Sequence, residues 1–500
     1  MFNIIKLNEK DNIGIAPMDI PQNININYGI KSINNIPYGH KISLKKIKSG
    51  DFIFKYGQII GISNKNIEPG EHVHSHNMGY SEFKREYIRK DIRNDINKNE
   101  KTEYFKGFKR NNGSSGTRNY IGLISTVNCS ATVVKKISDK INNYLKNNNF
   151  DNIDGAVCLK HSSGCGMNTS GYAMNVFNRT IEGFKIHPNF GKVFVIGLGC
   201  ECAQISLYNN DQEKRNIEYL NIQDEGGTNE IITKVTSKII NQLNEINSIS
   251  RTNIPISELT VALQCGGSDS YSGITANPAL GFASDMIIDH GGTTLLSETP
   301  EIYGAEHLLF EKSSNEKNIE KLNKQIEWWK KYVASNDSTL DNNPSPGNKK
   351  GGLTTILEKS LGAVSKAGNR NMVDVLDYAE QVKTKGFNFM NSPGYDPVSV
   401  TGQVASGANV ICFTTGRGSC FGFKPTPSIK IATNTNMYNK LSEDMDINAG
   451  TIMDNVASVN EVGKEIFDKI ISVASGEKSK SEINDYGDDE FNPWIIGATL

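Results

Sequence analysis

The sequence has no long apolar run and no excess of charge of either sign. No uninterrupted apolar stretch approaches the ~18 residues that a membrane-spanning helix needs, and the longest comparable stretch, residues 193–200, has the length of a strand. The 54 basic residues almost balance the 55 acidic ones, so the strong basic field of a nucleic-acid-binding protein is absent. We therefore expect neither a membrane nor a nucleic acid as a partner.

An export signal and a disulfide framework are also missing. The first residues, MFNIIKLNEKDN, carry charges and lack the apolar centre of a signal peptide. Eight cysteines in 500 residues, with no CxxC spacing, are too few and too scattered for a disulfide-stabilised fold. We expect a cytoplasmic protein, in which clustered cysteines are candidates for metal or redox chemistry.

The length of the chain and its pattern predict several domains. Residues 1 to about 80 alternate short apolar runs with glycine-bearing turns, which is typical of a small all-β module. Residues 81–106 are charged and have little apolar periodicity, which indicates a linker or a solvated surface segment.

Strands and helices alternate from about residue 107 to 250. NYIGLISTV has the apolar run of a buried strand, and Val134, Ile137 and Ile141 follow it at helical spacing. Residues 251–500 begin with another strand, ELTVALQC, and continue with glycine-rich loops. This order predicts a multidomain α/β protein in which two parallel-sheet domains follow the β module. Such sheets bind ligands beyond the carboxyl ends of their strands.

Four cysteines come shortly after predicted strands: Cys129, Cys165, Cys200 and Cys265. One interpretation is a thiolate cluster for iron or an iron–sulfur centre, with the first three as ligands. The other interpretation is that they are small residues buried in tight turns. We interpret the remaining cysteines as structural: Cys158, Cys202, Cys412 and Cys420.

Histidines are candidates for metal binding and for proton transfer. His72, His74 and His76 alternate in GEHVHSHN, so on a strand they share one face and could bind a divalent ion together with a carboxylate. An exposed polar face is the alternative. His40 and His161 lie in predicted turns and are candidate general bases, because histidine titrates near neutral pH. A single histidine is more often structural.

Two further loops carry charged groups that suit a site. Glu298 and Glu301 follow a predicted strand in SETPE, where they could hold a metal or act as acid and base, although Glu298 could instead cap a helix. Arg417 lies between two glycines in FTTGRG, which suits the binding of a carboxylate or phosphate. A tight structural turn is the alternative for this loop.

Several loop motifs occur together in a fixed order. They are GTRNYIG…STVNC, LKHSSGCG, VIGLGCE, CGGSDSYSGITANPALG, SETPEIYGAEHLL, NPSPGNKKGG, FTTGRG and MDINAGTI. In this order the chain resembles the altronate/galactarate dehydratase family over nearly its whole length. The resemblance also implies that the N-terminal module is a SAF (β-clip-like) domain that precedes the catalytic part.

The resemblance implies that the chain removes water from a sugar acid, in the first place D-altronate, to give 2-dehydro-3-deoxy-D-gluconate. A divalent metal that binds the substrate carboxylate and a hydroxyl would stabilise the charge that develops as the C2 proton leaves and the C3 hydroxyl departs. The resemblance implies Fe2+. Mn2+ could substitute for it, and the iron–sulfur cluster that the positions of the cysteines suggest is the alternative.

The residue types available for this chemistry are histidine and the paired glutamates. The predicted metal ligands are His72, His74, His76 and Glu301. The predicted acid–base groups are His40, His161 and Glu298. The predicted substrate-binding residues are Ser268, Asp269, Thr275, Asn277, Gly416, Arg417 and Gly418.

Other functions stay open from the sequence. The motifs also resemble galactarate-type members and sulfolactate sulfo-lyases, so galactarate, another aldarate or aldonate, and sulfolactate are alternative substrates. A non-catalytic sugar-acid-binding protein is a further alternative. The missing dinucleotide fingerprint argues against a nucleotide-dependent oxidoreductase. We expect a homo-oligomer.

Overall fold

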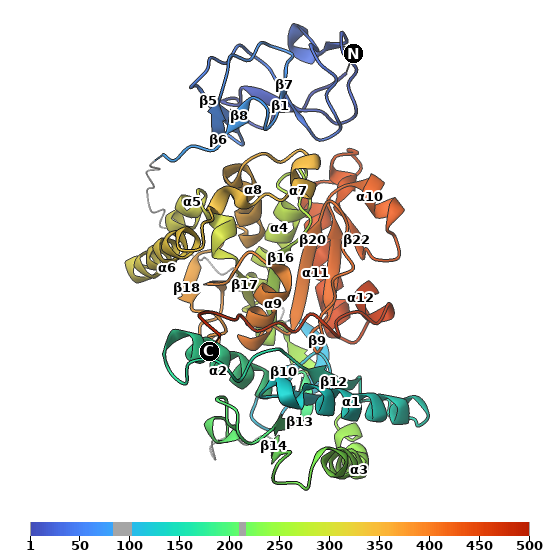
Figure 1. Ribbon diagram of the computed structural model, residues 1–500. Helices are drawn as coiled ribbons and strands as arrows, with labels where there is room; N and C mark the ends of the chain where they lie inside the picture. The colour runs from blue at the N-terminus through green and yellow to red at the C-terminus, as the bar shows by residue number, and fades with distance from the viewer. Residues whose placement is uncertain (1, 84–102, 210–216, 500) are drawn as a thin grey trace.

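The computed structural model describes residues 2–83, 103–209 and 217–499. Figure 1 shows the β-rich N-terminal module in blue at one end, a large α/β domain in yellow to red in the middle, and a smaller α/β domain in cyan and green at the other end. This arrangement confirms the predicted fold class, a small all-β module followed by parallel-sheet α/β domains. Residues 84–102, most of the expected linker, lie outside the described residues.

Short strands joined by tight turns build the N-terminal module. They are β1 (Ile13–Ile15), β2 (Asn25–Ile26), β3 (Ile30–Lys31), β4 (Lys41–Ser43), β5 (Phe52–Lys55), β6 (Gln58–Ser63), β7 (His72–Val73) and β8 (Met78–Gly79). Antiparallel pairing gives the sheets β1-β4-β7 and β5-β6-β8 and the ribbon β2-β3. Isoleucines such as Ile42, Ile53 and Ile60 are fully buried in it.

A parallel four-stranded sheet forms the smaller α/β domain. Its elements are β11 (Tyr120–Ser125), α1 (Ala131–Lys146), β12 (Gly155–Leu159), α2 (Gly171–Lys185), β13 (Phe190–Gly197), β14 (Ile217–Asn221) and α3 (Thr228–Asn247). The strand order is β12-β11-β13-β14. All six residues of β11 are buried, because α1 and α3 share an apolar core with one face and α2 packs on the other.

A small antiparallel sheet joins the two α/β domains. Its order is β10-β9-β15, with β9 (Tyr104–Lys109), β10 (Ser115–Gly116) and β15 (Thr252–Pro255). The last residues of the expected linker are therefore part of β9. The expected boundary at residue 106 therefore falls within this sheet, and the one at 250 lies just before β15, which pairs with β9.

A seven-stranded sheet forms the centre of the large α/β domain. Its strands are β16 (Thr260–Cys265), β17 (Thr293–Leu296), β18 (Met372–Leu376), β19 (Phe387–Met390), β20 (Val410–Thr415), β21 (Ser428–Ala432) and β22 (Ile447–Asn448). The order is β18-β19-β17-β16-β20-β21-β22, and all neighbours are parallel. The order reverses at β16, since the chain leaves it first toward β17 and later returns on its other side as β20. Such a switch point is where open α/β sheets bind ligands.

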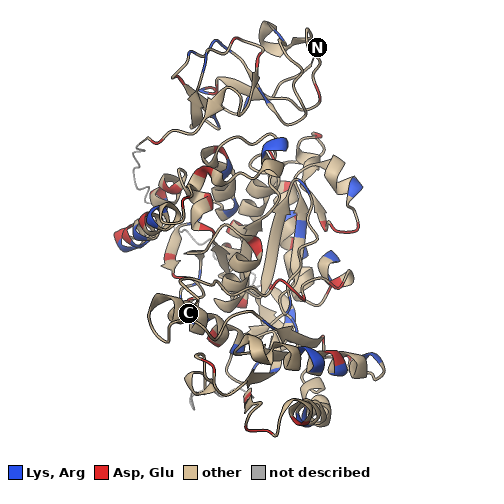
Figure 2. Ribbon diagram, in the orientation of Figure 1, with Lys and Arg blue, Asp and Glu red and all other residues tan. Residues whose placement is uncertain are grey.

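Helices cover both faces of this sheet. They are α4 (Ala276–Asp289), α5 (Glu306–Glu311), α6 (Glu316–Ala334), α7 (Pro346–Lys350), α8 (Ile356–Val364), α9 (Asp396–Ala405), α10 (Thr435–Lys440), α11 (Val459–Ala474) and α12 (Lys480–Ile483). Val261 and Leu263 of β16 belong to the core with α4 and α11, whereas Ala262 belongs to the core with α9. Figure 2 shows acidic and basic residues interspersed along α6 and α1. None of the described helices combines the length and apolar content that crossing a bilayer requires.

Candidate active site

Acids and a thiol lie together at the carboxyl edge of the seven-stranded sheet. Cys265 ends β16, Glu298 and Glu301 follow β17, and Asp396 begins α9 after β19. The ligand atoms of Cys265, Glu298 and Glu301 lie within 4.8 Å of one another. Asp396 interacts electrostatically with both glutamates. We call Glu298, Glu301 and Asp396 the acid group.

Two buried lysines accompany the acid group. Lys359 in α8 donates to Oε1 of Glu301 at 2.6 Å, and Nζ of Lys366, in the 3-10 helix Ser365–Ala367, lies 2.8 Å from Sγ of Cys265. Two ammonium groups beside the acids oppose the binding of another cation by charge repulsion. The arrangement therefore suits proton transfer better than metal binding.

The surroundings separate the pKa values of the three acids. Burial raises the pKa of Glu298 well above its usual range, and the charge of Glu301 adds to this effect. Burial also opposes ionisation of Glu301, but the ammonium of Lys359 prevails and lowers its pKa. Burial and repulsion from Glu301 raise the pKa of Asp396 to about 7. At neutral pH the acid group thus contains a protonated acid, a carboxylate and an acid that is half ionised, as acid–base catalysis requires.

The backbone at Glu298 is strained. Its φ of 75° lies in the left-handed region, which costs a residue other than glycine about 1–2 kcal/mol. The backbone N–H donates to Oγ of Ser392 at 3.0 Å, which helps to maintain this conformation. The side chain does not cap the following 3-10 helix, and Oε1 is buried without a hydrogen-bond partner among the described residues. Strain and an unsatisfied oxygen in one residue indicate a functional role.

Asp269 occupies the switch point between β16 and β20. Its carboxylate accepts hydrogen bonds from Ser272 N at 2.9 Å, Thr433 Oγ1 at 3.0 Å and Asn434 Nδ2 at 3.1 Å. A Cβ atom at Gly416 would lie only 2.1 Å from the carboxyl carbon of Asp269, so the loop after β20 approaches this closely because residue 416 is glycine. Asp269 therefore holds the loops after β16 and β20 together.

The other predicted substrate-binding residues differ in exposure. The side chains of Thr275 and Asn277 form hydrogen bonds in the protein interior, and Ser268 is buried in the same loop. Gly418 is half-buried after β20, and Arg417 beside it is exposed. Arg417 is thus the member of this set whose side chain is accessible to a ligand from solution.

Three imidazoles converge in the N-terminal module. The ligand nitrogens of His40, His72 and His74 lie within 4.8 Å of one another, and Nδ1 of His40 lies 3.0 Å from Nε2 of His72. Burial is the main cause that lowers the pKa of His72 and of His74 to about 3, so both rings are neutral at pH 7. Nδ1 of His74 is buried and has no hydrogen-bond partner among the described residues. Neutral, converging imidazoles with an open nitrogen fit a divalent transition metal.

This histidine group shares only His72 and His74 with the predicted ligand set. His40 takes part in it, because antiparallel pairing of β4 with β7 brings residue 40 opposite His74. His76 is exposed, and its ring centroid lies 5.2 Å from that of His72. Glu301 is not brought to the histidines, since its carboxylate binds a lysine in the acid group.

A buried ion-pair triad fastens the module to the large domain. Lys41 and Lys55 of the module each lie 2.8 Å from a carboxylate oxygen of Glu358 in α8, and all three side chains are fully buried. Burial opposes ionisation of Glu358, but the two lysines prevail and hold its pKa far below the usual range. Beside the triad, Nε2 of His40 lies 3.2 Å from the carbonyl oxygen of Lys350. The histidine group is therefore held against the carboxyl edge of the sheet.

Tyr56 extends from the turn between β5 and β6 into the large domain. Its φ of 58° is left-handed. A Cβ atom at Gly273 would lie 2.6 Å from its hydroxyl, so a glycine makes room for the ring. Tyr56 lines a small cavity together with Cys265, Asp269 and Lys359. The module thus contributes a phenol, whose pKa is raised by burial, to the edge where the acids lie.

His161 belongs to the smaller α/β domain and not to the sheet that carries the acid group. Its Nε2 lies 2.8 Å from the carbonyl oxygen of Ser125, and its Nδ1 accepts a hydrogen bond from Ser163 N at 3.2 Å. Burial lowers its pKa to about 4. Because the ring is neutral and both nitrogens are occupied, His161 stabilises the turn after β12.

The cysteines differ in exposure. Cys129, Cys165 and Cys200, the alternative ligand set, are exposed in turns after β11, β12 and β13. They do not belong to either of the described groups whose ligand atoms lie within 4.8 Å. Cys265 and Cys412, in the larger sheet, are buried.

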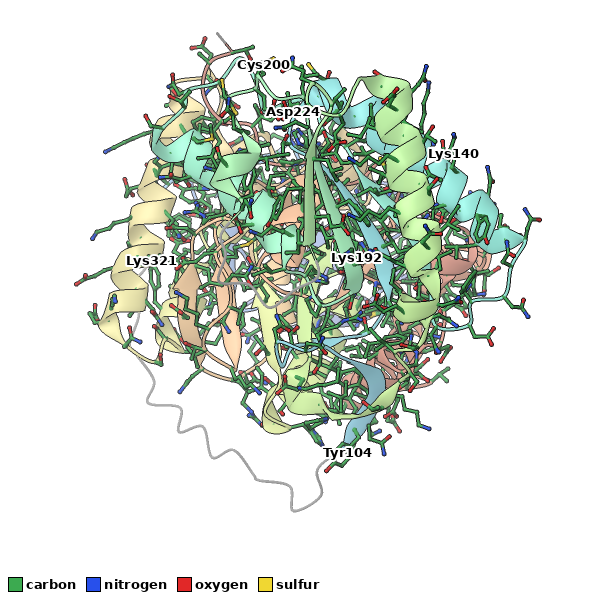
Figure 3. All side chains as sticks on the ribbon, turned by 90° about the horizontal axis from the view of Figure 1, so that it is seen from below. Tyr104, Lys140, Lys192, Cys200, Asp224 and Lys321 are labelled. Carbon is green, nitrogen blue, oxygen red and sulfur yellow. The ribbon has the colours of Figure 1, made fainter. Side chains whose placement is uncertain are left out.

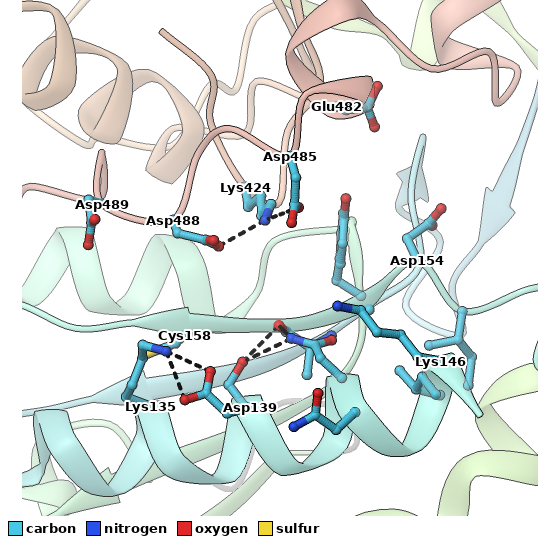
Figure 4. A pocket seen from close by; sticks show the side chains of 18 of the residues that line it. Lys135, Asp139, Lys146, Asp154, Cys158, Lys424, Glu482, Asp485, Asp488 and Asp489 are labelled. Carbon is cyan, nitrogen blue, oxygen red and sulfur yellow. Dashed lines mark hydrogen bonds and ion pairs between the residues drawn. The ribbon is translucent and has the colours of Figure 1, made fainter. Parts of the chain in front are cut away.

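A large cavity lies apart from these groups, between α1, β12 and the loop near residue 485 (Figure 4). Its volume is about 940 Å³. Its charged lining residues are largely paired with one another: Lys424 lies 2.8 Å from both Asp485 and Asp488, and Lys135 binds Asp139. No predicted site residue lines it, so it is not the candidate active site.

Sequence reasoning missed Asp396, Lys359, Lys366 and Tyr56. Asp396 stands before a proline after the apolar run FNFM, and an acid at this position of an α/β fold was a detectable signal. Lys359 lies in a helix whose residues are all buried, and a lysine within an apolar segment indicates a buried partner. No local pattern indicated the role of Tyr56.

Family models match three consecutive parts of the chain. Residues 2–81 match the model described as Altronate/galactarate dehydratase SAF domain. Residues 107–247 match D-galactarate dehydratase/Altronate hydrolase, second domain, and residues 256–499 match D-galactarate/Altronate dehydratase, C-terminal.

Curated relatives are similar over almost their full lengths. The altronate dehydratase of Bacillus subtilis (strain 168) is 36% identical over 499 residues, which cover 97% of this chain and 98% of that protein. The galactarate dehydratase (L-threo-forming) of Escherichia coli (strain K12) is 36% identical over 488 residues, 95% of this chain and 93% of that protein. The (2R)-sulfolactate sulfo-lyase subunit beta of Chromohalobacter salexigens is 29% identical over 381 residues, 76% of this chain and 94% of that protein.

Proposed function

The chain belongs to the altronate/galactarate dehydratase family and is a hydro-lyase, and from this premise we propose that it converts D-altronate into 2-dehydro-3-deoxy-D-gluconate and water. The observation that carries the proposal is the acid group, in which neighbouring carboxyl groups differ in proton affinity. Dehydration needs a base for the C2 proton and an acid for the C3 hydroxyl, and this group supplies both.

Asp396 and Glu298 are the proposed base and acid. The Asp396 carboxylate takes the proton from C2, and the electron pair of the C–H bond forms the C2–C3 double bond. The C3–O bond breaks as Glu298 gives its proton to the departing hydroxyl, which leaves as water. The resulting enol then converts to the 2-keto acid. Lys359 keeps Glu301 ionised, and the charge of Glu301 helps Glu298 to retain its proton until this step.

Arg417 is the proposed partner of the substrate carboxylate. Its guanidinium offers a planar fork of donors, which matches a carboxylate in two parallel hydrogen bonds. Its backbone N–H donates to the carbonyl oxygen of Gly267 at 2.9 Å, so the residue is fixed at the switch point. D-altronate has one carboxylate at its reacting end, which this single fork would bind. Galactarate, with a carboxylate at each end, is the alternative substrate.

His40, His72 and His74 are the proposed ligands of Fe2+, with Mn2+ as a substitute. Such an ion supplies Lewis-acid stabilisation of negative charge on substrate oxygens. The neutral rings and the open Nδ1 of His74 support this assignment. The acid group carries out the proton transfers in this proposal, so neither His40 nor His161 is needed as a base.

An anaerobic assay of the full chain with Fe2+ tests the proposal. D-altronate, galactarate and sulfolactate are compared, and the 2-keto-3-deoxy product and sulfite are measured. We expect the highest kcat/KM with D-altronate. A higher value with galactarate or release of sulfite from sulfolactate would overturn the substrate assignment, and no product from any sugar acid would overturn the reaction.

Two histidine variants test the metal assignment. His72→Ala should lose bound iron, whereas His76→Ala, which changes an exposed histidine of the same segment, should retain it. Equal iron contents of the two variants would contradict the proposed ligand set.

A further inference from the structure

Free thiols lie at one edge of the parallel sheet in the smaller α/β domain. β12, β11 and β13 are adjacent in the sheet and run in the same direction. Cys129 follows β11, Cys165 follows β12 and Cys200 follows β13. In Figure 3, Cys200 lies beyond one end of β13, and Lys192 lies near the other end. The thiols therefore occupy the side of the sheet where parallel α/β folds bind ligands.

The exposure of these thiols needs an explanation. Cysteine is among the residue types most often buried, and Cys265 and Cys412 of the larger sheet follow this rule. Cys129, Cys165 and Cys200 are all exposed, so packing does not account for them. Exposed thiols at three successive turns of one sheet edge suggest a shared ligand.

Backbone contacts hold the loops together within three residues of the thiols. The N–H of Asn128 donates to the carbonyl oxygen of Ser163 at 3.0 Å, and the N–H of Ala203 donates to that of Gly164 at 3.0 Å. A Cβ atom at Gly164 would lie 2.1 Å from the carbonyl oxygen of Thr126, so this close approach of two loops depends on glycine. The three loops thus form one preorganised surface.

A buried carboxylate fixes the loop of Cys200 without using the thiol. Glu201 accepts hydrogen bonds from Thr126 Oγ1 at 2.6 Å and from Gly199 N at 2.7 Å. The thiol of Cys200 has a weak contact with Nε2 of Gln223 at 3.5 Å. The loop geometry is therefore maintained by other groups, and the thiol is accessible to a ligand.

The three thiols are too far apart to bind one metal ion together. Two thiolates on one zinc ion, each about 2.3 Å from it, lie at most about 4.6 Å apart. The three thiols are not among the described groups whose ligand atoms lie within 4.8 Å. In an iron–sulfur cluster each thiolate binds a different iron, so the ligands are farther apart.

We propose that Cys129, Cys165 and Cys200 bind an iron–sulfur cluster of the four-iron, four-sulfide type. The fourth iron then has no protein thiolate and is open to an oxygen ligand. Binding of a preassembled cluster replaces three S–H bonds by three S–Fe bonds and releases three protons, without electron transfer. The site goes beyond the proposed function, because it lies in another domain from the acid group and the histidine group.

Anaerobic reconstitution of the full chain tests the site; ferric iron, sulfide and a thiol reductant are supplied, so that the reductant gives the two electrons that leave two ferric and two ferrous ions in the cluster. We expect a broad absorption at about 400 nm, about four acid-labile sulfides per chain, and about four irons in addition to the one proposed for the histidine group. Cys129→Ser, Cys165→Ser and Cys200→Ser should each lose most of this absorption. Because these side chains are exposed, the thermal stability of the variants without the cluster should match that of the unreconstituted wild type.

Cys202→Ser is the matched control, since Cys202 lies in the same loop as Cys200 but is not a proposed ligand. It should keep the absorption, and so should His72→Ala, which separates this site from the histidine group. Wild-type protein that gains no sulfide-dependent absorption would overturn the proposal. Loss of the absorption in Cys202→Ser to the same extent as in Cys200→Ser would overturn the three-thiol assignment.

Discussion

The two parallel sheets of the chain carry different chemistry at the same position of the fold. At the carboxyl edge of the seven-stranded sheet, Glu298 and Glu301 are buried, and Glu301 is paired with Lys359. At the carboxyl edge of the four-stranded sheet, Cys129, Cys165 and Cys200 are exposed. The same position in the topology thus carries buried acids in one domain and exposed thiols in the other.

The N-terminal module covers part of the edge of the larger sheet. Lys55 of the module binds Glu358 in α8, and Tyr56 lines a cavity together with Cys265 and Lys359. Burial is the main cause that raises the pKa of Glu298 and of Asp396. The module therefore lies close to a region in which burial sets proton affinities.

The largest expected effect comes from replacing Glu298, the proposed acid at the buried edge. Glu298→Gln keeps the size of the side chain but cannot donate a proton as an acid does, so kcat should fall by about 10²–10⁴-fold. Thermal unfolding should show little change, because the native group is already uncharged. The exposed Glu327→Gln in α6 is the control. Normal turnover of Glu298→Gln would remove the proposed acid.

The next effect tests the docking of the module on the larger domain. Glu358→Gln leaves Lys41 and Lys55 buried without their counter-ion and should destabilise the protein by about 3–5 kcal/mol. Denaturant unfolding measures this loss. Because the folded pKa of Glu358 is depressed, the stabilisation by the triad is present above the unfolded value near 4.5 and is lost as pH falls below it.

An apolar triple variant tests whether stable docking of the module needs the ion pairs themselves. Replacing Lys41 and Lys55 by Met and Glu358 by Leu should recover most of the stability. An equally unstable triple variant would show that the ionic triad itself is required.

A smaller effect is expected in the pH dependence of kcat/KM. Asp396 must be ionised to take a proton, and its pKa is about 7. The value of kcat/KM should therefore fall about tenfold for each pH unit well below 7. Glu301, Lys359 and Lys366 face the same group, so the measured pKa belongs to the coupled set. Asp396→Asn should remove this fall of kcat/KM at low pH. A fall that persists in this variant would exclude Asp396 as its origin.

The smallest effect concerns Arg417, which is exposed at the carboxyl edge of the larger sheet. Arg417→Lys keeps the charge but loses the planar fork, so kcat/KM should fall about tenfold, or about 1.4 kcal/mol. The buried acids should be unaffected, and the pH profile should keep its shape. Unchanged kinetics would leave residues 416–418 as a structural turn.

Local patterns predicted the fold well where the local and the tertiary structure agree. NYIGLISTV has the apolar run of a strand covered on both faces, and β11 is buried throughout. The resemblance to the dehydratase family, carried by its loop motifs, is confirmed by the family models. The small sheet of β9, β10 and β15 was missed, because it pairs segments about 150 residues apart that have no distinctive local pattern.

The site was predicted in part for a related reason. Glu298 and Glu301 follow one strand, so their proximity could be inferred from the sequence. Asp396 and Lys366 reach them from distant segments, and only the strand order of the sheet brings them together. The proton affinities could not be predicted at all, because they depend on burial and on charged neighbours from distant segments.

Consecutive residues at the start of α8 have a consequence for regulation by ligands. Glu358 binds the two lysines of the module, and Lys359 binds Glu301 of the acid group. Docking of the module and the charge state of the acids are therefore coupled through one turn of helix. By thermodynamic reciprocity, a substrate that binds tenfold more tightly to the docked form strengthens docking tenfold, or by about 1.4 kcal/mol. Bound substrate would then stabilise the contact between two domains of the enzyme that consumes it.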